Sequence, residues 1–486
     1  MVRQWRTIKT LNHRRKLLYV RPNNMGKTKF SKAFWVANMA EMFERAAYYG
    51  VFVVITLYLS NILGFSDIEA GIISGLYASL LYFLPPFTGA YADRIGFRKA
   101  MLLAFALLTV GYAGLALLPT GLEAAGLVEY GEKTVFTGLA TSGYRYLIVP
   151  VLVILVVGGS FIKGIISGSV AKETDEKNRA QGFAIFYAMI NIGSFSGKFI
   201  VDPLRRSLGD SGLIYLNWFS VVMTLVALVA IYIFYRSDNA QPDRSKSMKG
   251  IFRSFGKLCC NGRLVALILI ASGFWTVYYQ LYATMPKYVI RLAGEASTIG
   301  WYTMLNPLIV ILTVNGLTRM LSKRTALFSM MCGMCIIPIS ALIMSSGHLF
   351  SAPILGLHPV VFMMLCGICV QALAEALISP RYLEYFSLQA PKGEEGMYLG
   401  FAQLESFVST LVGFAMSGWL LDKYCPDPSR FATHEEWLAA SANAHYIWYY
   451  FAAIAAVAAI ALVIYQRVVK RLDEKKIQNS EFKIQN

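Results

Sequence analysis

The stretch "AEMFERAAYYG", residues 40–50, places Glu41, Glu44 and Arg45 inside a run that otherwise has the composition of a membrane-spanning helix. Charged side chains are costly at membrane depth. The two glutamates, Arg45 and Tyr48 are spaced i, i+3, i+4 and i+7, so a helix would carry all four on one face. We expect that face to point toward a water-filled cavity or a partner helix and away from lipid.

The composition of the whole chain agrees with a membrane environment. Of the 486 residues, 56% are hydrophobic and 15% are charged, which is unlike an ordinary soluble domain. Runs long enough to cross a bilayer recur along the chain. The predicted spans are 33–60, 68–91, 98–118, 147–170, 180–201, 213–235, 263–289, 297–321, 324–346, 357–383, 395–420 and 446–468. The sequence thus predicts an all-α integral membrane protein of about twelve helices.

The net charge of +17 is concentrated in three segments. Residues 1–32 contain ten Lys or Arg and no acid, and the linker 236–262 and the tail 469–486 are also basic. With an even number of spans all three segments fall on one side, which the positive-inside rule makes cytoplasmic. This placement argues against nucleic-acid binding. We expect a plasma-membrane protein, with the bacterial inner membrane favoured, whose basic start is a cytoplasmic arm, whether translation begins at Met1 or Met25.

The polar connection at 236–262 divides the spans into six and six. The predicted organisation is a basic arm (1–32), an N-terminal bundle (33–235), a cytoplasmic linker (236–262), a C-terminal bundle (263–468) and a tail (469–486). Transporters built from two such halves rock around a site near the membrane midplane. The linker is either a helix on the membrane surface, with Phe252 and Phe255 facing down, or a flexible connection.

The sequence gives little support for a metal site or an enzyme active site. Two C-x-x-C pairs, at 332–335 and 366–369, have a spacing that resembles zinc sites. They lie within apolar spans without nearby polar groups, so we interpret them as small packing residues. No nucleophile–base pair or metal-ligand set occurs at membrane depth. We therefore expect no enzyme activity, no metal and no cofactor.

The loop "GAYADRIGFRK", residues 89–99, resembles the cytoplasmic loop signature G-x-x-x-D-R-x-G-[RK]-[RK] of the major facilitator superfamily. The matching residues are Gly89, Asp93, Arg94, Gly96, Arg98 and Lys99. Gly89 would permit close helix packing, and Asp93 would meet a helix terminus or a basic partner in one conformation only. We interpret the loop as a gating element; an ordinary positive-inside loop with a glycine turn is the alternative.

The charges on the first span need partners. We expect Lys163, in "VVGGSFIKGIISGSV" of the fourth span, to complete a set of two carboxylates and two cations. Protonation of one carboxylate would unbalance this set, which is what coupling a proton to a conformational change requires. A purely structural ion-pair cluster is the alternative.

Further polar groups are expected at comparable depth in both halves. They are Tyr77 and Tyr82 on the second span, Tyr187, Asn191 and Ser194 on the fifth, Asn306 before Pro307 on the eighth, and Glu375 on the tenth. We expect Pro307 to interrupt the eighth span. We expect Pro380 to break the hydrogen-bond ladder of the tenth, freeing backbone groups that must be buried or line a cavity. Acids, cations, amides and phenols together suit a ligand that carries both signs of charge and peptide-like groups.

These motifs together resemble the proton-dependent oligopeptide transporter family, a branch of the major facilitator superfamily. "EMFERAAYYG" is similar to the family's E-x-x-E-R-F-x-Y-Y-G, with Ala46 in place of the Phe. "FYAMINIGS" is similar to its F-Y-x-x-I-N-x-G-S, "FWTVYYQ" to its F-W-x-x-x-[DE]-Q, and "AEALISP" to its G-E-x-x-x-S-P. The resemblance extends over nearly the whole membrane region.

The resemblance implies proton-coupled uptake of di- and tripeptides by alternating access. Separately, we expect a monomer in the lipid bilayer. The resemblance implies that the peptide carboxylate is held by Arg45 and Lys163, with help from Tyr48, Tyr49 or Tyr82. It implies that the amino end is held by Asn191, Asn306 and Glu375, and that Trp275 lines a side-chain pocket. The implied proton-coupling set is Glu41, Glu44, Arg45, Lys163 and Glu375.

The chain also departs from the family pattern. Tyr279 stands where many relatives have a seventh-span acid, the linker has no room for the two extra helices of many bacterial relatives, and the animal members' second-span His has no counterpart. A phenol with a reference pKa of about 10 should not titrate. The proton work must then fall to carboxylates, with Glu375 preferred and Glu384 or Glu405 as alternatives. Transport of another solute (nitrate, an amino-acid conjugate or a drug) and peptide sensing without transport remain open as functions.

Overall fold

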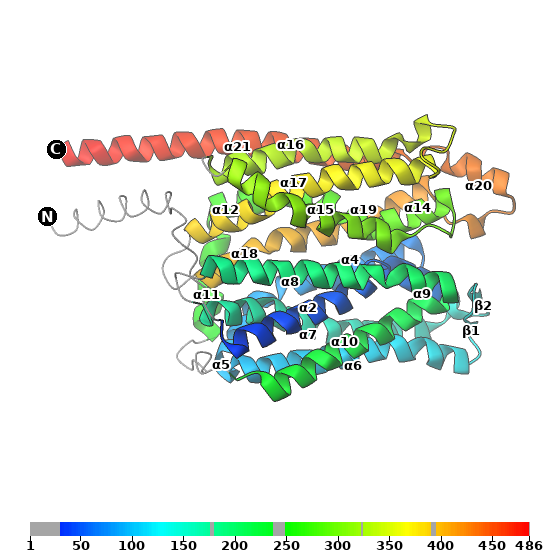
Figure 1. Cartoon of the computed structure of the whole chain (residues 1–486). Helices are drawn as coiled ribbons and strands as arrows, with labels where there is room; N and C mark the ends of the chain where they lie inside the picture. The colour runs from blue at the N-terminus through cyan, green and yellow to red at the C-terminus, as the bar shows by residue number, and fades with distance from the viewer. Residues whose placement is uncertain (1–29, 175–178, 237–247, 322–323, 390–394, 486) are drawn as a thin grey trace.

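The computed structural model describes residues 30–485 except 175–178, 237–247, 322–323 and 390–394, and these residues are almost entirely helical (Figure 1). Within this part of the chain, nine helices are long and apolar enough to cross a membrane, and a pair bent by 46° makes up to ten. The predicted all-α membrane fold is confirmed.

The first half of the chain contributes one bundle. Its elements are α2 (Lys32–Phe52), α3 (Ile55–Leu57) and a π-helical turn (Tyr58–Ile62), α4 (Asp67–Phe83), α5 (Pro85–Ile95), α6 (Phe97–Ala124), α7 (Ile148–Lys172), α8 (Arg179–Phe199), α9 (Val201–Leu208) and α10 (Ser211–Phe234). A short hairpin of β1 (Val128–Glu129) and β2 (Val135–Phe136) joins α6 to α7. Within the bundle α2 packs on α8 and α10, and α6 packs on α7 and α10.

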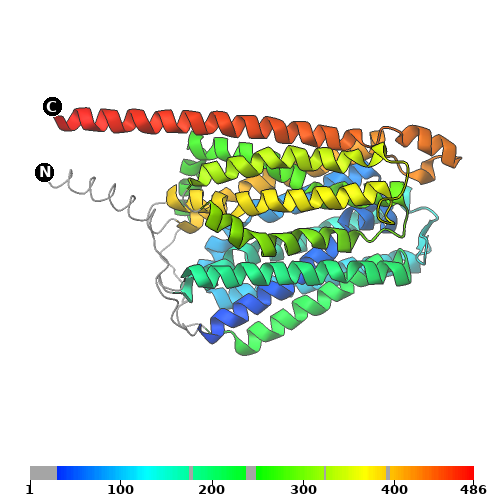
Figure 2. The ribbon, with the colours of Figure 1, turned by 45° about the horizontal axis from the view of Figure 1, so that its top comes forward.

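The second half forms the other bundle. Its elements are α11 (Met248–Cys259), α12 (Gly262–Tyr278), α13 (Gln280–Ala283), α14 (Met285–Ala293), α15 (Ile299–Met320), α16 (Ala326–Ser345), α17 (Pro359–Gln389), α18 (Glu395–Ala402), α19 (Leu404–Tyr424), α20 (His434–Ser441) and α21 (Tyr446–Gln485). Here α16 packs on α17 and α21, while α12 packs on α19 and α21. The two bundles meet mainly where α4 lies along α19 and α8 along α15 (Figures 1 and 2).

Helices occupy all the predicted span positions, although two lack the apolar length expected of a span. The helix α8 is not among the apolar candidates, and only 299–314 of α15 passes as a shorter apolar helix. Both helices face other protein across the bundle interface, and α8 buries the polar side chains of Asn191, Ser194 and Lys198 there. Hydropathy is therefore lower in these two helices because protein, and not lipid, covers a large part of them.

Small residues allow α2 and α8 to approach closely. A Cβ atom on Gly193 would lie 2.3 Å from the Met42 carbonyl oxygen, and one on Gly197 would lie 2.2 Å from that of Ala46. Both distances are shorter than any tolerated contact, so these positions require glycine. Ala46, which replaces the Phe of the motif that this stretch resembles, lies in this buried contact.

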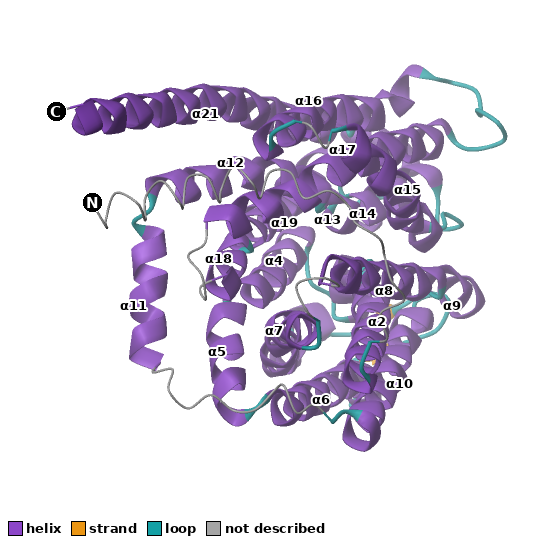
Figure 3. Cartoon of the chain, turned by 60° about the vertical axis from the view of Figure 1, so that its left-hand side comes forward, coloured by secondary structure: helices purple, strands orange, loops and turns teal. Residues whose placement is uncertain are grey.

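The linker between the bundles contains the helix α11. Of the two alternatives, a helix and a flexible connection, the described part of the linker agrees with the helix. Figure 3 shows α11 running beside α5 and α18, and these three helices are in contact. The rings of Phe252 and Phe255 lie 4.9 Å and 5.6 Å from that of Phe87, so they contact protein at this end of the bundles. The residues 237–247 of the predicted linker lie outside the described part of the chain.

A buried ion-pair network joins the bundles at the opposite end, near α9 and α14 in Figure 1. Asp67, at the start of α4, lies 2.6 Å from the Lys287 ammonium and 2.7 Å from the Arg291 guanidinium, both on α14. A second link between the bundles is formed by Asp202 of α9, which accepts a hydrogen bond of 2.7 Å from the backbone N–H of Trp301, in the first turn of α15. This end of the interface is therefore closed.

Candidate functional site

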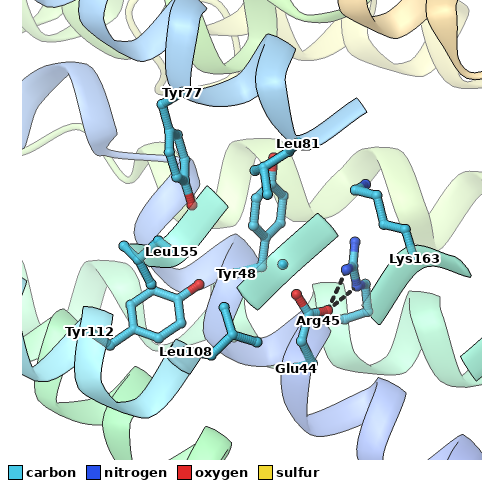
Figure 4. A pocket seen from close by; sticks show the side chains of 10 residues that line it. Glu44, Arg45, Tyr48, Tyr77, Leu81, Leu108, Tyr112, Leu155 and Lys163 are labelled. Carbon is cyan, nitrogen blue, oxygen red and sulfur yellow. Dashed lines mark hydrogen bonds and ion pairs between the residues drawn. The ribbon is translucent and has the colours of Figure 1, made fainter. Parts of the chain in front are cut away.

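The charged face of α2 is buried, as its spacing predicted. Glu41, Glu44 and Arg45 are all shielded from solvent. The Nε atom of Arg45 lies 3.2 Å from Oε1 of Glu41, and the same guanidinium pairs with Glu44 (Figure 4). Arg45 also covers the ring of Tyr48, at 5.3 Å from its centroid. One arginine thus serves two carboxylates within a single helix.

Lys163 takes a position different from the one expected. No described carboxylate lies within ion-pair distance of its ammonium, although its charge acts on Glu41 from farther away, so the set of two carboxylates and two cations stays a prediction. Arg45 pairs with both glutamates and leaves Oε2 of Glu41 buried without a hydrogen-bond partner among the described residues. The Lys163 ammonium instead lies 3.9 Å from the ring centroid of Tyr82, a cation–π contact. It remains able to bind an anion.

A small pocket brings these groups together (Figure 4). Its lining residues are Glu44, Arg45, Tyr48, Tyr77, Leu81, Leu108, Tyr112, Leu155, Gly159 and Lys163. The side chains of Arg45 and Lys163 lie at one side of Tyr48, with Tyr77, Tyr112, Leu108 and Leu155 at the opposite side. Two cations beside phenols form a suitable arrangement for a carboxylate.

A second polar cluster lies in the other bundle. Nδ2 of Asn306 on α15 donates a hydrogen bond of 3.0 Å to Oε2 of Glu375 on α17, and Tyr278 contacts Oδ1 of Asn306 at 3.5 Å. The helix α15 continues through Pro307, so the interruption expected there does not occur, and α17 likewise continues through Pro380. Each proline removes one backbone donor without ending its helix. The side-chain contacts, and not freed backbone groups, define this cluster.

Two other predicted contacts to the ligand lie apart from that cluster. The Asn191 side chain is buried and donates to the carbonyl of Tyr187 at 2.8 Å, within its own helix. Trp275 stacks edge-on against Tyr278 at 5.0 Å, and its indole nitrogen has no hydrogen-bond partner among the described residues. The structure therefore joins Asn306 to Glu375 but does not join Asn191 to either.

Tyr279 connects the bundles by hydrogen bonds. Its hydroxyl lies 2.9 Å from that of Tyr82 on α4 and 3.1 Å from Oγ of Ser406 on α19. Ser406 in turn contacts Oε1 of Glu405 at 2.9 Å, and this carboxylate is buried. Glu384 instead pairs with Arg381 and is much more exposed. Of the two alternative carboxylates, Glu405 is the one that reaches the site.

Lys198 lies at the interface between the two bundles, and the sequence analysis did not predict it as a site residue. It lies near the end of α8, is 1% exposed, and donates to the Tyr282 hydroxyl at 3.2 Å and the Thr303 carbonyl at 3.3 Å. Its position is seven residues after Asn191, so the two share a helix face. That spacing, together with an isolated lysine in a predicted span, was a usable signal.

The predicted gating loop is described except for the side chains of three residues, and Arg98 within it donates a hydrogen bond of 2.7 Å to the carbonyl of Tyr232 on α10. Gly89 lies within α5, where its Cα would be 3.6 Å from a Cβ on Gly164 of α7. Gly96 separates α5 from α6 with φ +88°, a conformation that favours glycine. The side chains of Asp93 and Arg94 lie outside the described residues, so the latch role stays a prediction.

Comparison with known sequences places the chain in a large transporter superfamily. The sequence model of the Major Facilitator Superfamily matches residues 35–355. A dipeptide and tripeptide permease A from Serratia proteamaculans is 25% identical over 271 residues, which cover 54% of this chain and 46% of the permease. A dipeptide and tripeptide permease B from Yersinia enterocolitica is 26% identical over 215 residues, covering 44% of this chain and 39% of the permease. The chain spans about half the length of the curated relatives it matches.

Solved structures support the same fold over more of the chain. A structure from a study of substrate recognition in proton dependent oligopeptide transporters matches with a TM-score of 0.68 and 18% identity, covering 91% of this chain and 99% of that one. A structure of tetrameric PepTSo2 matches with a TM-score of 0.68 and 19% identity over the same shares. These structures share the fold of the chain, and the peptide permease relatives agree with the family resemblance drawn from the motifs.

Proposed function

The chain belongs to the major facilitator superfamily, and from this premise we propose that it is a proton-coupled symporter that imports di- and tripeptides by alternating access. The observation that carries the proposal is the pairing of opposite binding groups across the bundle interface. Arg45 and Lys163 supply positive charge in the first bundle. Glu375, held by Asn306, supplies an acceptor for an ammonium in the second. A peptide, with a carboxylate and an ammonium at its two ends, matches that arrangement.

The arginine that serves two carboxylates supports the proton-coupling role. While Glu41 and Glu44 are ionised, both compete with the substrate for Arg45. Binding of a proton to one of them removes one negative charge and frees part of the guanidinium for the peptide carboxylate. Binding of proton and peptide would then be favourable together, which is the requirement for symport.

The closed end of the interface would act as the outer gate of an import cycle. The basic segments would lie in the cytoplasm by the positive-inside rule, so the end sealed by Asp67, Lys287 and Arg291 would face outside. Uptake would require this network to separate and reform once in each cycle. We propose the bacterial inner membrane as the location and a monomer as the working unit; the peptide permeases of bacteria named above support the first of these.

Uptake into proteoliposomes tests the proposal. Labelled dialanine should accumulate above its external concentration when the lumen is alkaline relative to the bath, and should only equilibrate without that gradient. The matched control is Lys163→Ala, which should show no accumulation. Accumulation of nitrate, a drug or an amino-acid conjugate in place of dialanine would identify the alternative transporter. Saturable dialanine binding without uptake would identify a sensor.

A further inference from the structure

Lys198 is a buried cation that the proposed carboxylate clamp does not use. In the described ranges of the chain, no carboxylate lies within ion-pair distance of its ammonium, although the charge of Glu375 acts on it from farther away. Desolvating an ammonium without a close counter-ion is costly. Membrane-embedded lysines are therefore retained when they bind or move something.

The neighbours of Lys198 satisfy the ammonium only in part. Of its three N–H donors, two are directed to the Tyr282 hydroxyl and the Thr303 carbonyl, at the long distances of 3.2 Å and 3.3 Å. The rings of Tyr49 and Tyr282 lie 4.9 Å and 5.3 Å from the ammonium and provide weaker cation–π stabilisation. One donor is left without an acceptor among the described residues, and neutral acceptors do not balance the charge.

The position of Lys198 lies between the two ends of the proposed peptide site. Its aromatic neighbour Tyr49 contacts the Tyr48 ring at 5.2 Å, next to Arg45. Its other neighbour Tyr282 contacts the Tyr278 ring at 6.3 Å, next to the Asn306–Glu375 pair. A substrate whose ends lie at those two clusters would bring its side chains near Lys198.

We infer that Lys198 forms an anion subsite that selects peptides with an acidic side chain. The inference rests on the proposed peptide transport function and adds a substrate preference to it. A side-chain carboxylate would accept the remaining N–H donor and supply the missing negative charge. The hydrogen bond would be charge-assisted, the stronger kind within a protein. A basic side chain would be repelled at the same point.

The test compares two peptides of nearly the same shape. Binding of alanyl-glutamate and alanyl-glutamine to the purified full-length protein is measured by tryptophan fluorescence, together with dialanine as the uncharged reference. The wild type should bind alanyl-glutamate about tenfold or more tightly than alanyl-glutamine. The variant Lys198→Met, which keeps the length and removes the charge, should bind both equally. Tyr282→Phe, which removes the hydroxyl that accepts from Lys198 but keeps the ammonium, should retain the preference for alanyl-glutamate.

The outcomes separate this inference from the function on which it rests. Equal binding of the two peptides by the wild type, or an unchanged ratio in Lys198→Met, overturns the anion subsite while dialanine binding leaves the peptide function intact. Failure of the wild type to bind any of the three peptides overturns both. Retained dialanine binding by Lys198→Met shows that the variant is folded, so its loss of preference is attributable to the charge.

Discussion

Removing the Asp67 carboxylate should shift the balance between the two conformations of the transport cycle. Asp67 is 4% exposed and holds Lys287 and Arg291 of the opposite bundle at 2.6 Å and 2.7 Å. In Asp67→Ala, both cations stay buried without this partner, which typically costs about 3–5 kcal/mol for a buried pair. The cost applies only to the conformation in which this end is closed, since separation of the bundles exposes the cations to water.

The expected magnitude follows from that difference. At about 1.4 kcal/mol for each tenfold change, the closed-to-open ratio at this end should fall by roughly two to three and a half powers of ten. The assay is electron-paramagnetic distance measurement between two spin labels, one on α9 and one on α14. The variant should show a longer distance that is rare in the wild type.

A matched control is available at the same end of the molecule. Arg430 and Asp422 form an ion pair of 2.6 Å, but their side chains are 43% and 33% exposed and both belong to the second bundle. Asp422→Ala should therefore change stability by less than about 1 kcal/mol and leave the distance distribution unaltered. An Asp67→Ala variant with the wild-type distribution and uptake rate would refute the gate assignment.

The remaining predictions concern helix packing, substrate binding and coupling. Gly197→Ala should destabilise the protein by about 1–3 kcal/mol, because the added Cβ would lie 2.2 Å from the Ala46 carbonyl oxygen. The control is Gly316→Ala, whose added Cβ would meet no atom of a neighbouring segment within 4 Å. Equal unfolding temperatures of the two variants would contradict the close packing of α2 on α8. Arg45→Lys should retain weakened, driven uptake of dialanine because it keeps the charge but loses the two-pronged guanidinium; uptake at the wild-type rate would exclude that role. Glu375→Gln should lose both affinity and pH-driven accumulation, whereas Tyr279→Phe should still concentrate peptide, since a phenol forms hydrogen bonds but should not titrate. The reverse pattern in uptake across a pH series would assign coupling to Tyr279.

Much of this arrangement follows from helical spacing. The spans, the shared face of Glu41, Glu44 and Arg45, and the depth of Glu375 were predictable because period 3.6 and hydropathy act within one helix. The resemblance of several motifs to one transporter family added the expected grouping of residues from different spans. A helix within the linker was one of two predicted alternatives, since amphipathic spacing is also a local property.

Contacts between helices were harder to predict. Spacing places Lys163 at the right depth. It does not predict that Arg45 pairs with both glutamates while Lys163 lies over the ring of Tyr82, because these contacts depend on side-chain conformations. Pro307 predicted an interruption of its span, whereas α15 continues through this residue. The neighbours of Lys198 come from residues about 84 and 105 positions away, a separation at which one sequence carries no pairing signal.

The most direct test of proton-coupled peptide import measures protons and not peptide. Proteoliposomes containing a pH-sensitive dye are prepared with equal pH inside and outside and with the membrane potential clamped at zero. Addition of dialanine outside should acidify the lumen in the wild type, because each entering peptide brings at least one proton, and should leave the lumen unchanged with Lys163→Ala. Entry of labelled dialanine without acidification would contradict the account.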